Sequence, residues 1–286
     1  MSRILAKASI DRLHRRERRD RRMDRLKQIE ELNQFLLEEM PRYREQAAQF
    51  PHTVSEQRRL LRSLMNLRPP MPLDPAFLRP QDKLLSTERE EKGVVDGDRL
   101  PGTPSDQRLA LWQGDITRLK VDAIVDAGNS ALLGCFCPCH GCIDNAIHSA
   151  AGLQLRDECG YIMKAQGHPE PAGRAKLTEG YNLPARYVLH TVGPVVGRQT
   201  TARDRADLAS CYRSCLELAL SHDCRTVAFP SISTGVYRFP LDRAAPIAVG
   251  AVRGFLASHP AAFDEILFVC FDEKTKHAYD MALERR

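Results

Sequence analysis

The spacing of apolar residues changes about one third of the way along the chain. In the first part they recur every three or four positions, which is the period of one helix face. One such run covers residues 29–40 and stops at Pro41. A second begins at Thr53, with Glu56 in the capping-box position, and continues through residues 60–65. The sequence therefore predicts two amphipathic helices in this part.

Prolines then interrupt the pattern. Residues 69–80 contain too many of them for regular structure, and the charged stretch that follows, up to Asp106, is typical of an exposed loop. Residues 1–100 are therefore predicted to form a small helical and irregular N-terminal extension.

After Asp106, short apolar runs alternate with helical segments. The strand-like runs are rich in Val, Ile and aromatic residues. They cover residues 109–112, 123–125, 187–192, 226–229 and 266–270. The helical segments lie after Asp144, at about residues 203–220 and at residues 241–256. This alternation indicates an α/β fold with a mostly parallel sheet covered on both faces.

The composition permits a globular core, because 43% of the 286 residues are hydrophobic. No apolar run approaches the roughly 20 residues that span a bilayer, and the basic head of the chain lacks the apolar stretch of a signal peptide. The nine cysteines are odd in number and are not spread as a disulfide framework, which predicts reduced thiols. We therefore expect a cytoplasmic protein with no membrane partner, and a monomer by default.

Eight arginines make the head of the chain basic, within a net charge of +5. They are Arg12, Arg15, Arg16, Arg18, Arg19, Arg21, Arg22 and Arg25. A basic stripe of this kind can contact nucleic acid or an acidic membrane. Four carboxylates interrupt it at helical spacings, however, which favours a solvated helix or a frayed terminus. Nucleic acid is therefore not expected as a partner.

Three loops that follow predicted strands carry residues suited to a ligand, and ligands of parallel sheets bind at the carboxyl ends of the strands. Asp115 can accept hydrogen bonds from an amino group, or can simply stabilise a turn. Residues 126–130 are small and include Asn129, which offers a donor and an acceptor. In the loop 230–240, Ser, Thr and Gly precede a helix, which suits a phosphate because backbone N–H groups and the helix dipole converge there. Each loop alone is also typical of an ordinary turn, but together they indicate one ligand site.

A cysteine-rich segment, GCFCPCHGC, lies at the same edge and contains four of the nine cysteines. Cys135, His140 and Cys142 are spaced as C-x4-H-x-C, and thiolate and imidazole are ligands that Zn(II) takes in tetrahedral geometry. A structural zinc would need Cys137 or Cys139 as a fourth ligand, whereas a catalytic zinc keeps three and leaves one position open. The spacing does not decide between them, and redox-active thiols are a further alternative.

The chain resembles the macrodomain family through four motifs in the family's order: VDAIVDAGNSALLG, IDNAIHSAAG, LPARYVLHTVGP and FPSISTGVYRFP. GCFCPCHGC stands where ordinary macrodomains have a short glycine-rich loop, and it resembles the pattern G-C-F-x-P-x-H-x-C of the zinc-dependent branch. The resemblance implies a three-layer α/β/α fold with a mixed, largely parallel sheet in residues 101–286. It also implies that Cys135, His140 and Cys142 are the zinc ligands.

The family binds ADP-ribose, so the resemblance assigns roles to the loops. Asp115 and the backbone of Ile116 would hold the adenine, and Asn129 would orient the distal ribose. Phe271 would stack on the adenine, although burial in the core explains an aromatic residue there almost as well. The pyrophosphate would be held by Ser233, Thr234, Gly235, Val236 and Tyr237. Asp126 replaces the asparagine more usual in macrodomains, with an effect left open.

Members of the zinc-dependent branch remove ADP-ribose from modified proteins. The resemblance therefore implies hydrolysis at the anomeric carbon of the distal ribose, which would release mono-ADP-ribose from an acidic side chain. Zinc in an open site can lower the pKa of a water towards roughly 7 or polarise the leaving group.

Asn129 and Asp144 are the predicted catalytic residues. Asp144 would act as a base or orient the water, or would only favour the first turn of a helix. His148 is expected to pack or hydrogen-bond without binding metal. The alternative hypothesis is a non-catalytic ADP-ribose-binding module in which a structural zinc only orders the loop.

Overall fold

The computed structural model describes residues 23–285. Most of the arginine-rich head therefore lies outside the described residues, and its solvated character stays a prediction. Arg25, the described member of that set, donates to Glu91 Oε2 at 2.7 Å and lies 3.4 Å from Glu88. Across residues 23–285, no helix combines the length and the apolar character that a membrane span requires.

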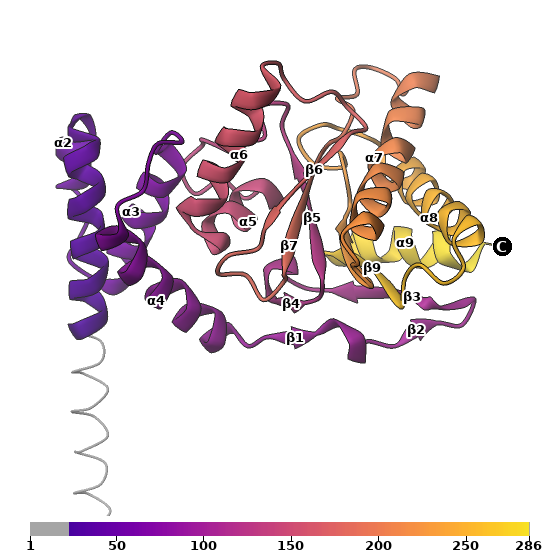
Figure 1. The fold of residues 1–286 in the computed structure, drawn as a ribbon, viewed down its shortest axis with the longest axis horizontal. Helices are drawn as coiled ribbons and strands as arrows, with labels where there is room; N and C mark the ends of the chain where they lie inside the picture. Colours follow the sequence, from indigo (N-terminus) through magenta and orange to yellow (C-terminus); the bar gives the residue numbers. More distant parts are fainter. Residues whose placement is uncertain (1–22, 286) are drawn as a thin grey trace, which may run out of the picture.

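A mixed sheet of seven strands forms the centre of the molecule (Figure 1). Its strands are β2 (Gly102–Thr103), β3 (Asp106–Gln113), β5 (Ala123–Gly128), β6 (Ala175–Glu179), β7 (Tyr187–Val192), β8 (Thr226–Pro230) and β9 (Glu265–Cys270). They are ordered β2-β3-β9-β8-β5-β7-β6, with the five inner strands parallel and both edge strands antiparallel. The mixed, largely parallel sheet is confirmed, whereas the sequence did not predict the two edge strands. A separate parallel pair joins β1 (Val95–Asp96) to β4 (Leu119–Lys120).

Helices cover both faces of the sheet, as the alternation of strands and helices predicts. One face carries α5 (Ile143–Ala151) and α6 (Leu153–Gln166); the other carries α7 (Ala202–Ser221), α8 (Leu241–Ser258) and α9 (Glu273–Glu284). Successive residues of β5 point to opposite faces, so Ile124 joins the apolar cluster of α5 and Val125 joins that of α7 and α8. Burial of each such side chain stabilises the fold by about 1.5–3 kcal/mol.

The N-terminal extension has an apolar core of its own. It contains a helix over residues 23–39, followed by η1 (Pro41–Tyr43), α2 (Arg44–Ala47), α3 (Val54–Leu67) and α4 (Pro75–Lys92). Both predicted helices are confirmed, and Leu32, Leu61 and Phe77 meet in their shared core. Only half of the capping box forms, because Thr53 Oγ1 accepts from the Glu56 N–H while the Thr53 N–H donates to the Pro51 carbonyl.

The prediction of irregular structure in residues 69–80 and of an exposed loop up to Asp106 is wrong for a large part of that stretch, because α4 occupies residues 75–92. Its start has a clear cause: Asp74 accepts a hydrogen bond from the Ala76 N–H at 2.8 Å and is the N-cap. Pro75 then occupies the first turn, where a missing N–H costs nothing. The prolines that suggested a break therefore include one that begins a helix.

The extension packs against α5 and α6. Arg156 of α6 inserts beneath the carboxyl end of α3, where its Nη1 donates to the carbonyls of Met65, Asn66 and Arg68 at 2.7–2.8 Å. Asn66 also donates to Ser149 Oγ at 3.1 Å. These contacts hold the extension beside the segment that contains the four clustered cysteines.

Candidate active site

The parallel strands bring the predicted ligand loops to one end of the sheet, where the strands have their carboxyl ends. Gln113 of β3 pairs with Cys270 of β9, and Pro230 of β8 pairs with Val269, so these three strands end at the same level. Asp115, the loop 231–237 and Phe271 follow these ends directly. Asn129 follows the end of β5, which runs parallel to β8. The carboxyl-end rule thus places four of the predicted positions on one edge.

Cys135, His140 and Cys142 form a compact donor cluster. Their ligand atoms all lie within 4.8 Å of one another, and Cys135 Sγ is 3.7 Å from His140 Nδ1. Two thiols and one imidazole, all half-buried, fit the coordination chemistry of Zn(II). The cluster has three donors, which is the number that a catalytic zinc takes from the protein.

Cys137 and Cys139 do not belong to this cluster. Cys139 Sγ is directed towards α3, where it lies 3.4 Å from Ser63 Oγ and 3.6 Å from the Arg59 carbonyl. The Cys137 side chain is exposed. In this arrangement of the loop, neither thiol supplies a fourth donor.

The third donor, Cys142, also begins α5. Its Sγ accepts from the Asn145 N–H at 3.4 Å, so it occupies the N-cap position. Burial raises the pKa of the Cys142 thiol to about 12, and the nearby Cys135 and Asp144 act in the same direction. A bound divalent cation opposes this effect, because a coordinating thiol is deprotonated by the metal charge. The raised pKa of Cys142 argues against a free reactive thiolate at this position.

Asn129 and Asp144, the two predicted catalytic residues, lie together. Asn129 Nδ2 donates to Asp144 Oδ2 at 3.3 Å and to the Gly134 carbonyl at 3.2 Å. Asp144 is 5% exposed and stands in the first turn of α5, so both interpretations of its position agree with the structure. Burial, followed by repulsion from Asp126, raises the pKa of Asp144 well above its usual range.

Asp126 belongs to a buried group of titratable side chains beneath Asp144. His190 Nδ1 lies 3.1 Å from Asp126 Oδ2, and His190 Nε2 lies 2.9 Å from Thr178 Oγ1. Burial alone lowers the pKa of His190, but Cys159 and Asp126 outweigh it and raise that pKa well above its usual value. Asp126 is thus paired with the His190 imidazole.

His148 is packed as predicted. Its side chain is buried, and Gly134, with φ of +78°, lies so close to the ring that an added Cβ would sit 2.9 Å from Cγ. Within the described residues neither ring nitrogen has a hydrogen-bond partner, although Nε2 is 3.5 Å from Asp144 Oδ1. Burial and the neighbouring His190 both lower the pKa of His148, so this imidazole is neutral.

The predicted pyrophosphate loop contains Ser233 in the left-handed region, with φ of +64°. Its Oγ is buried and has no hydrogen-bond partner among the described residues. Val236 is 68% exposed, and a Cβ added at Gly235 would meet no atom within 4 Å. Burial, together with Asp144 and Cys142, raises the pKa of Tyr237. The Tyr237 carbonyl accepts from the Val196 N–H at 2.9 Å, which ties the end of this loop to the segment after β7.

The predicted adenine residues behave differently from one another. Asp115 Oδ1 accepts from the N–H and the hydroxyl of Thr117 at 3.0 and 2.7 Å, so the turn-stabilising interpretation holds. The Ile116 side chain is buried in the core, which leaves only its backbone for a ligand. Phe271 is 84% exposed at the end of β9, so the alternative of burial in the core is wrong. Its exposure leaves the ring free to stack on a planar ligand.

Comparison with known proteins brings these features together. The family model described as Macro domain matches residues 125–248. A protein of Treponema medium named protein-ADP-ribose hydrolase is 48% identical over 251 residues, which is 87% of this chain and 95% of that protein. The chain belongs to the macrodomain family.

Solved structures agree with this assignment. The Trypanosoma brucei macrodomain in complex with ADP-ribose is 38% identical, with a TM-score of 0.61, and the match covers 77% of this chain and 94% of that one. A macrodomain mutant of Oceanobacillus iheyensis with ADPR is 36% identical, with a TM-score of 0.56 and coverage of 62% and 91%. The resemblance read from the sequence motifs is thus confirmed for the family and for the fold.

Two residues that contact the candidate site were missed from the sequence. Gly193 follows β7 at the same sheet edge, and a Cβ there would overlap Ser233 Oγ, so the strand-end rule applied to β7 would have found it. Arg62 of α3 donates to Asn145 Oδ1 at 2.6 Å and to the His140 carbonyl at 3.3 Å. No local pattern marks Arg62, because its partners lie about 80 positions away.

Proposed function

We propose that this macrodomain is a zinc-dependent hydrolase that removes mono-ADP-ribose from acidic side chains of a modified protein. The observation that carries the proposal is a three-donor cluster, Cys135, His140 and Cys142, at the sheet edge that also presents Asn129 and Asp144. The name of the Treponema medium relative supports hydrolysis, and the ADP-ribose of the Trypanosoma brucei structure supports the ligand.

ADP-ribose would lie along the loops at the carboxyl ends of the strands. Phe271 and the Asp115–Ile116 segment would receive the adenine, and the loop 233–237 would receive the pyrophosphate. The unpartnered Ser233 Oγ supports this assignment, because a buried hydroxyl without a partner costs about 1–3 kcal/mol unless a ligand satisfies it. The distal ribose would then lie nearest Asn129.

Cys135, His140 and Cys142 would hold the Zn(II) ion. Bound zinc would supply a Lewis acid with a free coordination position, and a positive charge that favours the ionised form of the nearby Asp144. Two hydrogen bonds hold the cysteine-rich segment that supplies these ligands. Arg62 donates to the His140 carbonyl, and Asn145 donates to the Cys137 carbonyl at 3.0 Å.

Asp144 would accept the proton of the attacking water. Asn129 donates to its Oδ2, while Oδ1 is buried, has no hydrogen-bond partner among the described residues and lies 3.5 Å from His148 Nε2. A carboxylate leaving group is stable as an anion at neutral pH, so release from an acidic side chain needs no strong acid in the site. Asp144 can therefore act as the acceptor for the proton of the attacking water.

The test measures release of ADP-ribose from a protein that carries one ADP-ribose on a glutamate. Cys142→Ala should lose zinc and slow turnover at least about 100-fold, because even partners outside the metal shell cost about 10–100-fold. Cys139→Ala is the matched control and should keep its zinc and its turnover, since its Sγ faces α3. Binding of free ADP-ribose is measured alongside for each variant.

Three results separate the hypotheses. Wild-type protein that binds ADP-ribose but never releases it would identify a non-catalytic ADP-ribose-binding module. Equal turnover by zinc-depleted protein would exclude zinc dependence. Release from a serine-linked substrate without release from the glutamate-linked one would overturn the acidic side-chain specificity.

A further inference from the structure

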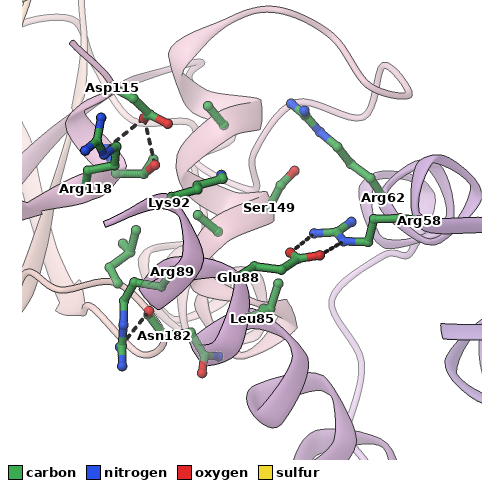
Figure 2. Close-up of a pocket in the computed structure, with 14 residues that line it drawn as sticks. Arg58, Arg62, Leu85, Glu88, Arg89, Lys92, Asp115, Arg118, Ser149 and Asn182 are labelled. Carbon is green, nitrogen blue, oxygen red and sulfur yellow. Dashed lines mark hydrogen bonds and ion pairs between the residues drawn. The ribbon is translucent and has the colours of Figure 1, made fainter. Parts of the chain in front are cut away.

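A second polar pocket lies between the extension and the macrodomain, apart from the predicted pyrophosphate and ribose positions. It is a cavity of about 150 Å³ bounded by α3 and α4 on one side and by α5 and the turn after β3 on the other (Figure 2). Asp115 is the one lining residue that is also predicted to contact ADP-ribose. Arg62 also lines the pocket and holds the His140 carbonyl. The proposed hydrolysis assigns no role to the remaining lining residues.

Positive charge dominates its lining. The charged side chains are the cations Arg58, Arg62, Arg89, Lys92 and Arg118 and the carboxylates Glu88 and Asp115. Glu88 is already engaged by Arg58, which donates two hydrogen bonds to it at 2.8 and 2.9 Å. Asp115 caps its own turn through Thr117. Neither carboxylate is paired with any of the four remaining cations.

Those four cations meet only neutral acceptors within residues 23–285. Arg62 donates to Asn145 and to the His140 carbonyl, and Arg89 donates to the Asn182 carbonyl at 3.0 Å. Arg118 donates to the Gly93 carbonyl at 2.8 Å. For Lys92, at the end of α4, no hydrogen bond or ion pair with a described residue is found. Arg62, Arg89 and Arg118 are half-buried, whereas Lys92 is exposed. Like charges gathered in this way repel one another, and an anion between them relieves the repulsion.

We propose that this pocket binds an oxyanion, a phosphate or carboxylate group. The cavity is smaller than the roughly 300–1,000 Å³ of sites for drug-sized molecules, so it fits one such group and not a whole nucleotide. Guanidinium and ammonium donors form their strongest hydrogen bonds with these oxygens. Because α3 and α4 supply four of the five cations, the extension creates the site. The anion comes either free from solution or on the substrate protein.

The first experiment titrates the full chain with inorganic phosphate, against chloride at equal ionic strength, with ADP-ribose present at saturation. Wild type should bind phosphate, and Lys92→Gln and Arg89→Gln should each weaken binding about three- to tenfold through loss of one charge-assisted contact. Lys83→Gln removes an exposed lysine of α4 outside the pocket and should bind as wild type does. Lys92→Gln has no described partner to lose, so its fold should be intact.

Two outcomes overturn the proposal: no preference for phosphate over chloride in wild type, or equal binding by wild type, Lys92→Gln and Arg89→Gln. This readout does not depend on turnover, so it stands apart from the hydrolase proposal. A second arm identifies the source of the anion in the functioning enzyme. A KM for the ADP-ribosylated protein raised in Lys92→Gln at constant kcat supports a group on the substrate, and an unchanged KM with weakened phosphate binding supports a free anion.

Discussion

Asp126 shows how one residue changes the charge beneath an active site. Its Oδ2 faces His190 Nδ1 at 3.1 Å, and both side chains are at most 1% exposed. A buried carboxylate without a partner would cost several kcal/mol, and the His190 ring is the partner that the fold supplies. The same carboxylate contributes to the raised pKa of Asp144. Asp126 therefore connects the buried charge pair to the predicted catalytic residue.

Glu265, at the start of β9, makes the stability of the fold depend on pH. Burial, with Asp98 and Asp96 nearby, raises its pKa from 4.5 to about 7. Between these values the folded state keeps a proton that the unfolded state has lost, so stability falls as the pH rises through this window. Glu265→Gln removes the effect and should be more stable than wild type by roughly 1–3 kcal/mol at pH 8, with little difference at pH 4.5.

Urea unfolding at the two pH values measures this difference for Glu265→Gln. Glu217→Gln, on an exposed position of α7, shows the effect of a surface carboxyl. A constant difference between Glu265→Gln and wild type from pH 4.5 to pH 8 would mean that the carboxyl titrates normally.

Among the elements, the junction of α3 with α6 depends on one guanidinium. Arg156 donates to three carbonyls at the end of α3 and to the Leu133 carbonyl at 2.6 Å, and its guanidinium lies 4.5 Å from the centre of the Phe136 ring. Burial lowers the pKa of Arg156 to about 10, which leaves it charged at neutral pH. A cation at this helix terminus also interacts favourably with the helix dipole.

Arg156→Met keeps much of the volume but leaves three buried carbonyls and the part-buried Leu133 carbonyl without this donor. The free energy of unfolding should fall by about 3 kcal/mol or more, because each buried unpaired polar group costs about 1–3 kcal/mol. Arg213→Met replaces an exposed arginine of α7 and should change it by less than about 0.5 kcal/mol. Equal urea midpoints for the two variants would show that solvent satisfies the carbonyls instead.

The sequence predicts elements best where the cause is local. Alternating strands and helices lead to the sheet, the ends of its strands lead to the ligand loops, and C-x4-H-x-C predicts the donor cluster. The sequence did not predict helix α4, because its N-cap Asp74 and first-turn Pro75 lie among prolines that break regular structure elsewhere. The exposure of Phe271 could not be predicted from the sequence either, because tertiary neighbours decide whether an aromatic residue at a strand end packs or projects.

At the scale of the whole molecule, the extension acts as part of the site. Arg62 holds the loop that supplies His140, and Asn66 accepts the Cys139 N–H at 2.9 Å, so two residues of α3 fix the cysteine-rich segment from outside the macrodomain. Figure 1 shows the extension lying beside α5 and α6, on the opposite side from α8 and α9. The second polar pocket lies at the same contact between the extension and the macrodomain. The cysteine-rich segment and this pocket therefore both depend on the extension being packed in place.

Separation of the extension should therefore weaken metal binding as well as stability. A chain of residues 101–286 loses every contact that Arg62 and Asn66 make with the loop, and it exposes Leu153, which is buried in the core of the extension. Its unfolding temperature should fall by several degrees, since about 1 kcal/mol shifts the midpoint by roughly 2–4 °C at this size. Competition with a chelator should also show about tenfold weaker zinc affinity, by analogy with the loss of a partner outside the metal shell.

Arg62→Met in the full chain separates these two effects. Because the extension stays docked through Arg156 and the apolar core, the unfolding temperature should fall less than in the truncated chain, while zinc affinity should fall by a similar factor. Zinc affinity that is unchanged in both proteins would mean that the loop keeps its geometry unaided. The extension would then serve the fold and the basic pocket, but not the metal.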